Sequence, residues 1–397
     1  MKPLAFVALL ALGIACLASS TAAIPLSLTP KPHPLVIWHG LGDSAHSQGI
    51  DELISQLKEA FPGLFVHSVN LGGDSDADDR KQGFFGHVND QIQVACDQLA
   101  AIPELQDGFD AIGFSQGGQF LRAYVQRCNT PRVRNLVTFG SQHMGIADLP
   151  ACQPTDLLCR LASTALRGGI YTDYAQSHLV SAQYYRNPTD PSAFANYLAK
   201  NDFILDINNE GPSVNRTYAR NLAKLDNFVM LMFDKDVTVE PKQSSWFASY
   251  PIRNASDPEE GNGHHGGDDE PTPLRQSVIY TEDRIGLKQL DKRGGLVMEL
   301  CHGVHMQIDP ACQLKVFGKY VGTPQLAFVP DAARHTWARV LYTFGGLRSE
   351  EFGGMLATSL AVSLSMWLLL RGIVSLVALP AKIVQRRKEG EGRIRLL

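Results

Sequence analysis

The sequence predicts an α/β fold with a mostly parallel central sheet. Its apolar segments are short and continuous rather than alternating, as expected for strands that helices bury on both faces. One of these segments leads directly into a Gly-x-Ser-x-Gly motif at residues 113–117 and then into a run with helical spacing. The 397 residues are 44% hydrophobic, which is enough for one large globular domain. We expect that domain over residues 24–320.

The elements of this domain follow in order along the chain. We expect strands at residues 35–38, 65–69, 109–113, 136–140, 228–233 and 295–300. We expect helices at residues 50–60, 88–99 and 119–127, and an acidic loop at residues 72–81. Between about residues 148 and 226, short amphipathic segments replace the strand-like runs. This pattern predicts a helical insertion over the sheet, the usual place for a lid or binding groove, although a helical subdomain without a ligand has the same pattern.

The motif places Ser115 at a sharp turn between a strand and a helix, where a serine can serve as a nucleophile. Gly113 and Gly117 flank it because a side chain at either position would collide with the neighbouring strand and helix. A serine hydroxyl needs a base within hydrogen-bonding distance, and that base needs a carboxylate partner. In the α/β-hydrolase fold these groups follow in the order serine, acid, histidine. The sequence therefore predicts a serine hydrolase of this fold.

Two candidates exist for each partner of Ser115. Asp234 and Asp236 both follow the strand at residues 228–233, and either could be the acid. His302 and His305 both follow the strand at residues 295–300. Position favours His305 as the base, because a loop residue reaches across to the serine more easily. These residues alone leave the acid open.

The oxyanion that forms during acyl transfer needs two amide donors. The amide of Gln116, directly after the serine, is one of them. We expect the amide of Leu41, in the turn after the first strand, to be the other. His39 is expected to brace that turn, and Asp43 is expected to cap it.

Both ends of the chain carry membrane-related patterns. Residues 1–23 have a basic start, an apolar core and small residues before a cleavage site near Ala23, as in a secretory signal peptide, with an uncleaved anchor as the alternative. After a linker at residues 321–354, residues 355–380 predict one transmembrane helix. The basic tail at residues 381–397 then lies in the cytosol. The alternative is a helix that lies on the membrane or packs on the domain.

Cysteines and sequons agree with a secretory route. Removal of the signal peptide leaves six cysteines, and an even number is typical of disulfides in an oxidising compartment. Spacing allows local pairs Cys152–Cys159 and Cys301–Cys312, which would leave Cys96 with Cys128, but six cysteines allow fifteen pairings. Asn215 and Asn254 begin glycosylation sequons.

Composition argues against several other classes of protein. The net charge of −4 and the lack of a basic stripe or a Walker loop give no support for nucleic-acid or nucleotide binding. Residues 254–273 form an acidic, low-complexity loop that cannot contribute to a core. His264 and His265 in this loop could ligate a metal, but a solvated loop is the simpler interpretation. We expect no metal and no organic cofactor.

Several segments together resemble the palmitoyl-protein thioesterase family. They are residues 35–44, 113–123, 126–128, 140–143, 215–218, 245–247 and 280–288, and the likeness extends from about residue 33 to 320. The resemblance implies a lysosomal-type hydrolase that cleaves the thioester between a long fatty acyl chain and a cysteine of an S-acylated protein. It also implies that the inserted segment supplies the acyl-binding groove.

The resemblance also assigns residues. It implies Asp236 as the acid and His305 as the base, disulfides Cys96–Cys128 and Cys152–Cys159, and a glycan at Asn215. Leu41 departs from the methionine that is common in the family, although a backbone donor survives that change. Cys301, Cys312, the acidic loop and the anchor lie outside the family pattern, and a disulfide between these two cysteines would clamp the His305 loop.

The expected protein is therefore a thioesterase of the lysosome or vacuole lumen, tethered by its C-terminal helix. A lipid esterase or acyl-CoA thioesterase with the same three residues is the alternative enzyme. An inactive lipid-binding or cargo-binding membrane protein is the alternative from another class.

Overall fold

The computed structural model describes residues 31–323, except residues 73–74, 151, 153–154 and 254–269. The predicted signal peptide, linker, transmembrane helix and basic tail, and the sequon at Asn254, lie outside the described residues. Within the described ranges, no helix is both long enough and apolar enough to span a bilayer.

Six parallel strands form one sheet, as the short apolar runs predicted. Their order across the sheet is β2-β1-β3-β4-β5-β6, and every pairing is parallel. The strands are β1 (Leu35–Trp38), β2 (Val66–Ser68), β3 (Phe109–Phe114), β4 (Val133–Phe139), β5 (Asn227–Phe233) and β6 (Leu296–Cys301). Because all six run the same way, the loops that follow them gather at one edge of the sheet, where α/β proteins bind their ligands.

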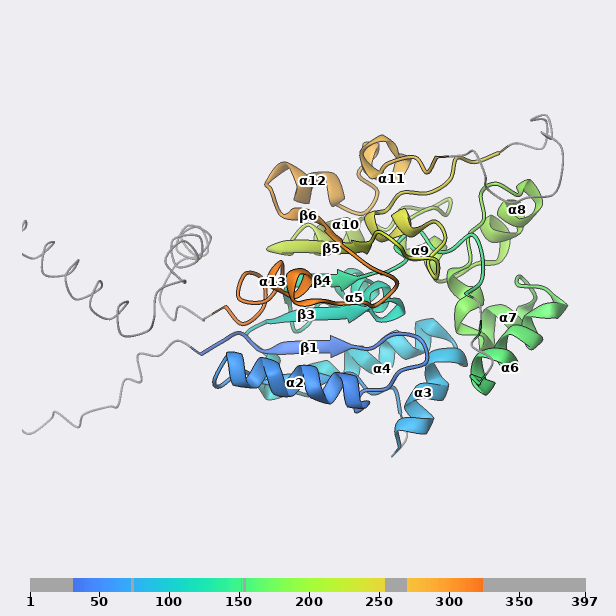
Figure 1. The fold of residues 1–397 in the computed structure, drawn as a ribbon. Coiled ribbons are helices and arrows are strands. Elements are labelled where there is room, and N and C mark those ends of the chain that lie inside the picture. Colours follow the sequence, from blue (N-terminus) through green and yellow to red (C-terminus); the bar gives the residue numbers. More distant parts are fainter. Residues whose placement is uncertain (1–30, 73–74, 151, 153–154, 254–269, 324–397) are drawn as a thin grey trace, which may run out of the picture. The chain divides into compact units, whose positions relative to one another are not determined.

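Two hydrophobic clusters cover the two faces of the sheet. Along β1, Leu35 and Ile37 belong to one cluster, while Val36 and Trp38 belong to the other, because successive side chains of a strand point to opposite faces. Figure 1 shows α2 (Gln48–Ala60) in front of the sheet, and α4 (Val88–Ala100) and α5 (Gln116–Arg127) behind it.

The prediction of a loop at residues 72–81 is wrong for most of that segment. Residues Asp76–Phe84 form helix α3. The Oγ of Ser75 accepts a hydrogen bond from the amide of Asp78 and so caps the helix, and acidic residues fill its first turn. Aspartates in a first turn are stabilised by the helix dipole, so the acidic run marks a helix start rather than a solvated loop.

The inserted segment is helical, as the sequence pattern predicted. Among its described residues there is no strand, and Figure 1 shows α6, α7 and α8 beyond the carboxyl ends of the strands. The elements are α6 (Leu157–Ala165), η2 (Leu166–Gly168), α7 (Asp173–His178), η3 (Val180–Tyr184), α8 (Pro191–Lys200), α9 (Ile204–Ile207) and α10 (Arg216–Leu222). The remaining helices are η1 (Pro103–Leu105), η4 (Lys242–Trp246), η5 (Leu274–Gln276), α11 (Val278–Thr281), α12 (Leu287–Lys292) and α13 (Pro310–Leu314).

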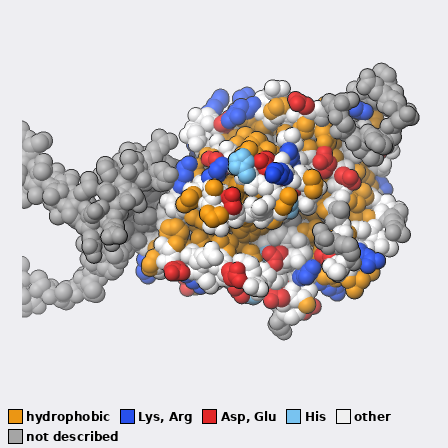
Figure 2. Space-filling model, viewed as in Figure 1, with side chains coloured by type: hydrophobic (Ala, Val, Ile, Leu, Met, Phe, Trp, Pro, Cys, Tyr) orange, Lys and Arg blue, Asp and Glu red, His pale blue; other side chains and the backbone are white. Residues whose placement is uncertain are grey.

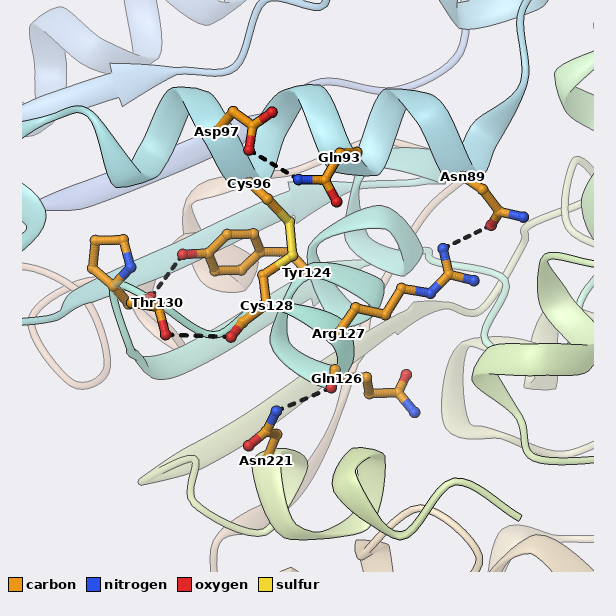
Figure 3. Close-up of a disulfide and its surroundings, with 11 residues drawn as sticks. Asn89, Gln93, Cys96, Asp97, Tyr124, Gln126, Arg127, Cys128, Thr130 and Asn221 are labelled. Atoms are coloured by element: carbon orange, nitrogen blue, oxygen red, sulfur yellow. Dashed lines mark hydrogen bonds between the residues drawn. A yellow bond between two sulfur atoms is a disulfide. The ribbon is translucent and has the colours of Figure 1, made fainter. Parts of the chain in front are cut away.

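Three disulfides join the six cysteines, in the pairs that spacing and the family resemblance indicated. Cys96–Cys128 links α4 to the end of α5, next to the buried ring of Tyr124 (Figure 3). The other two are Cys152–Cys159, before and within α6, and Cys301–Cys312, between β6 and α13. The last pair closes the loop that contains His305.

Candidate active site

Ser115 lies at the tip of a strained turn between β3 and α5. Its φ is 50° and its ψ is −120°, a conformation that non-glycine residues rarely adopt. A Cβ on Gly113 would lie 2.3 Å from the Cα of Gly118 in α5, and a Cβ on Gly117 would lie 2.3 Å from the carbonyl oxygen of Trp38 in β1. The predicted collisions with helix and strand are therefore confirmed, and they explain the glycines of the motif.

A chain of hydrogen bonds connects Ser115 to one histidine and one aspartate. The Oγ of Ser115 lies 3.0 Å from Nε2 of His305, and Nδ1 of His305 lies 2.6 Å from Oδ2 of Asp236. The three residues come from the ends of β3, β6 and β5. Ser115 and Asp236 are buried, and the side chain of His305 is largely buried. The arrangement is the one by which a histidine removes a serine proton while a carboxylate orients its ring.

The buried carboxylate of Asp236 uses both of its oxygens. Oδ2 contacts His305, while Oδ1 accepts hydrogen bonds from the amides of Thr238, at 2.8 Å, and Val239, at 3.1 Å. These bonds hold the carboxylate in one orientation and attach the segment at residues 238–239 to it.

Asp234 and His302 form a second pair beside the first. Nδ1 of His302 lies 2.8 Å from Oδ2 of Asp234, and the amide of Gly303 donates to Oδ1 of Asp234 at 2.8 Å. The bonds from Gly303 and His302 lower the pKa of Asp234. The side chain of His302 is 77% exposed. This pair thus joins the loop after β5 to the loop after β6, while His305 and Asp236 lie inward toward Ser115.

The turn expected to hold an oxyanion is braced by a buried ion pair. Nδ1 of His39 lies 3.0 Å from the carbonyl oxygen of Gly40, and Nε2 lies 3.1 Å from Oδ2 of Asp79 in α3. Asp79 also accepts hydrogen bonds from the amides of Leu71 and Ala45. His39 therefore braces the turn, as expected. Asp79 was not found from the sequence, because nothing distinguishes it within its acidic run.

Each residue of this pair favours the charged form of the other. Burial alone would lower the pKa of His39, but the hydrogen bond and charge of Asp79 raise it overall. Burial alone would raise the pKa of Asp79, but His39 and the two amides lower it overall. The side chain of His39, with its raised pKa, thus lies directly behind the turn that contains Leu41. Asp43, as expected, caps the turn by accepting a hydrogen bond from the amide of Ser44.

Ser115 and His305 open into a cavity of about 270 Å3. Leu41 and its flanking glycines line it on one side, which places the predicted oxyanion turn beside the serine. The rest of the wall is largely apolar and comes from loops and from the inserted segment. Its main contributors are Ile146, Pro150, Tyr184, Val239 and Met306. An apolar cavity of this kind suits a hydrocarbon chain.

Two further expectations concern metals and nucleic acids. Within the part of the chain that the structure describes, no group of His, Cys, Asp and Glu side chains could hold a metal ion. His264 and His265 lie outside the described residues. On the face shown in Figure 2, acidic and basic side chains are interspersed and form no large patch of one sign.

Comparison with known proteins identifies the family. A family model described as palmitoyl protein thioesterase matches residues 34–305, a span that includes Ser115, Asp236 and His305. The chain belongs to the palmitoyl-protein thioesterase family. It is a thioesterase with the α/β-hydrolase fold.

Relatives in this family resemble most of the chain. Palmitoyl-protein thioesterase 1 of Caenorhabditis elegans is 37% identical over 294 residues, which cover 74% of this chain and 92% of that protein. Palmitoyl-protein thioesterase 3 of Dictyostelium discoideum is 31% identical over 274 residues, which cover 69% and 85%. A solved structure of a monoacylglycerol lipase from Paleococcus ferrophilus shares 14% identity with a TM-score of 0.36, over 72% of this chain and 93% of that one. That structural likeness is too weak to bear on substrate.

Proposed function

We propose that this thioesterase hydrolyses the thioester between a long-chain fatty acyl group and a cysteine of an S-acylated protein. The observation that carries the proposal is the hydrogen-bonded chain Ser115–His305–Asp236 at the mouth of an apolar cavity. The names of the relatives in Caenorhabditis elegans and Dictyostelium discoideum support the same substrate class.

In the first step Ser115 acts as the nucleophile. Nε2 of His305 accepts the hydroxyl proton while Oγ forms a bond to the thioester carbonyl carbon. Asp236 holds the ring in the correct tautomer and stabilises the imidazolium. The carbon–sulfur bond then breaks, and the cysteine thiol leaves with the proton from His305. The acyl group remains on Ser115 as an ester.

The oxyanion of each tetrahedral intermediate is held by the amides of Leu41 and Gln116. Gln116 begins α5, and the first amides of a helix have no acceptor within the helix, so this donor is available to the oxyanion. The dipole of α5 favours negative charge at the same position. Leu41 contributes through its backbone, so its difference from the common family residue leaves the chemistry intact.

Hydrolysis of the acyl-enzyme completes the cycle. His305 removes a proton from water, which attacks the ester carbonyl, and then returns that proton to Oγ of Ser115 as the fatty acid leaves. Apart from that water, side chains and amides of the chain supply every group in this scheme. The acyl tail occupies the apolar cavity, whose wall includes Tyr184 of the inserted segment.

The compartment we propose is the lumen of the lysosome or vacuole. Three disulfides favour an oxidising route, and a relative from Homo sapiens at 25% identity is named lysosomal thioesterase PPT2. Asn215, an exposed residue at the start of α10, is available for a glycan. A signal peptide at residues 1–23, an anchor at residues 355–380 and a glycan at Asn254 complete the proposal.

The test compares two substrates with the purified full-length chain. A palmitoyl thioester and the matching oxygen ester are offered to the wild-type enzyme and to Ser115→Ala. We expect turnover of the thioester, its preference over the oxygen ester, and loss of both activities in a folded Ser115→Ala variant. Preference for the oxygen ester would favour a lipid esterase. Activity that survives in Ser115→Ala would remove the nucleophile assignment.

A further inference from the structure

A second cavity lies beside the one that contains Ser115, and the proposed reaction does not use it. Its volume is about 370 Å3. Its wall contains carboxylates, hydroxyls and an amide, and is more polar than the wall of the first cavity. The residues that matter are Asp148, Tyr185, Asn187, Thr238, Glu240 and Tyr250. We call it the acidic pocket.

A thin wall separates the acidic pocket from the catalytic cavity. Three short segments build this wall, and in each one two neighbouring residues line opposite cavities. The pairs are Ile146 and Ala147, Tyr184 and Tyr185, and Val239 and Glu240. Backbone hydrogen bonds connect the segments: the amide of Ile146 donates to Tyr184, and the amide of Ala147 donates to Glu240.

Thr238 lies where the two cavities meet, because it lines both of them. Its amide donates to Oδ1 of Asp236, the carboxylate that orients His305. A substrate whose thioester lies at Ser115 therefore has the acidic pocket next to it, across the Thr238 side chain. Any group that the pocket binds belongs to a part of the substrate close to the reacting carbon.

The charged side chains that line the acidic pocket are both carboxylates, Asp148 and Glu240. Among the described residues, no Lys or Arg forms an ion pair with Asp148 or Glu240. Glu240 instead accepts a hydrogen bond from the hydroxyl of Tyr250. Burial raises the pKa of Tyr185, and the charges of Asp148 and Asp190 raise it further, while a hydrogen bond with Asn187 opposes them. Tyr185 and Tyr250 add aromatic faces, which attract cations.

The carboxylates and aromatic rings of the acidic pocket favour a cation over a hydrocarbon tail. A hydrocarbon tail in the acidic pocket would take the carboxylates of Asp148 and Glu240 out of water without a counter-charge, which is costly, whereas the catalytic cavity has a more apolar wall, with Asp43 as its one carboxylate. A guanidinium or ammonium group pairs with both carboxylates and with the ring faces. We propose that the acidic pocket binds a Lys or Arg side chain of the substrate protein, adjacent to the acylated cysteine. The inference rests on the proposed function and narrows its substrates to proteins acylated beside a basic residue.

The test uses the full-length enzyme and matched S-palmitoyl peptides that carry either Lys or Gln next to the acylated cysteine. We expect kcat/KM to be about fivefold to tenfold higher for the Lys peptide at low salt, as for one or two partly exposed ion pairs. The preference should shrink at high salt, which screens such pairs. The readout is the ratio of kcat/KM for the Lys peptide to kcat/KM for the Gln peptide. A change that affects both peptides equally cancels in this ratio.

Glu240→Gln tests the pocket directly. The substitution removes the charge and keeps an acceptor for Tyr250, and we expect it to bring the ratio close to one. Glu59→Gln, which removes an exposed carboxylate on α2 outside both cavities, should leave the ratio unchanged. Equal rates for the two peptides, or a Lys preference that persists in Glu240→Gln, would overturn the inference. So would a change in preferred acyl-chain length instead of the ratio, because the cavity would then hold the tail.

A binding measurement separates this inference from the proposed function. Affinities of the two peptides for Ser115→Ala, measured by calorimetry, should show the same preference for Lys without any turnover. If the wild-type enzyme cleaves no thioester, the proposed function fails, while the affinity ratio still decides whether the pocket binds a cation.

Discussion

Oδ2 of Asp236 lies 2.6 Å from Nδ1 of His305, and that contact favours Asp236 over Asp234 as the acid, as the family resemblance does. Asp234 is only two residues away and makes an equally direct contact with His302, at 2.8 Å. The difference lies in what each histidine reaches. Nε2 of His305 contacts Ser115, whereas the side chain of His302 is mostly in solvent.

This relationship predicts opposite outcomes for two conservative variants. Asp236→Asn should lower kcat by about 10⁴-fold, because an amide partner stabilises the wrong tautomer of His305. Asp234→Asn should lower kcat by less than about tenfold, because it weakens only an exposed contact between two loops. Turnover of a palmitoyl thioester and a circular dichroism spectrum of each variant provide the measurement. Similar losses in both variants would contradict the assignment of the acid.

The buried pair His39–Asp79 predicts a dependence of stability on pH. The pKa of His39 is raised above 6.5, so its contribution is complete below pH 6.5 and is lost as the pH rises through the folded-state value. The pKa of Asp79 is lowered below 3.8, so its contribution is complete above pH 3.8 and is lost as the pH falls through the folded-state value. The pair therefore stabilises the fold fully between pH 3.8 and pH 6.5.

Asp79→Asn should lower the free energy of unfolding by about 3–5 kcal/mol at pH 5.5, because it leaves a buried imidazole without its partner. The loss of stability with rising pH above 6.5 that His39 causes should also disappear. Asp51→Asn is the matched control, because Asp51 faces His46 at 3.7 Å with both side chains exposed, and it should cost less than about 1 kcal/mol. Urea unfolding at several pH values measures both effects. An advantage of the wild type over Asp79→Asn that grows between pH 6.5 and 8 would contradict the sign.

Features that depend on local pattern were predictable from the sequence, and features that depend on distant segments were not. The apolar run before Ser115 and the glycines around it specify a strand and a turn within ten residues, so Ser115 could be proposed as the nucleophile from the sequence. Asp79 contacts His39 although the two residues are forty positions apart in the chain. The neighbouring acidic residues give no sign that Asp79 is the one that makes this contact. The wall between the two cavities could not be predicted from the sequence either, because segments near residues 146, 184 and 239 come together only in the fold.

Gly117 supplies a test of the turn that holds Ser115. Gly117→Ala places a Cβ 2.3 Å from the carbonyl oxygen of Trp38, so the backbone must move, and we expect a loss of at least about 3 kcal/mol in unfolding free energy. Gly49→Ala in α2 meets nothing within 4 Å and should stabilise the protein by up to about 1 kcal/mol. Thermal unfolding of both variants measures the contrast. An unchanged melting temperature in Gly117→Ala would show that the turn can relax.

The disulfide that contributes more to stability is expected to have the smaller effect on KM. Cys96–Cys128 closes a loop over 32 positions and Cys152–Cys159 over only 7. The chain-entropy model then assigns about 4 kcal/mol to the first and about 2.5 kcal/mol to the second. Double alanine variants of each pair, followed by urea unfolding, should reproduce this order.

Cys96 and Cys128 lie between helices behind the sheet, whereas Cys152 closely follows Pro150 in the wall of the catalytic cavity. Loss of Cys152–Cys159 should therefore raise KM for the acyl substrate more than loss of Cys96–Cys128, although it costs less stability. A larger KM increase in the Cys96–Cys128 variant would mean that the catalytic cavity depends on the α4–α5 contact rather than on the segment before α6.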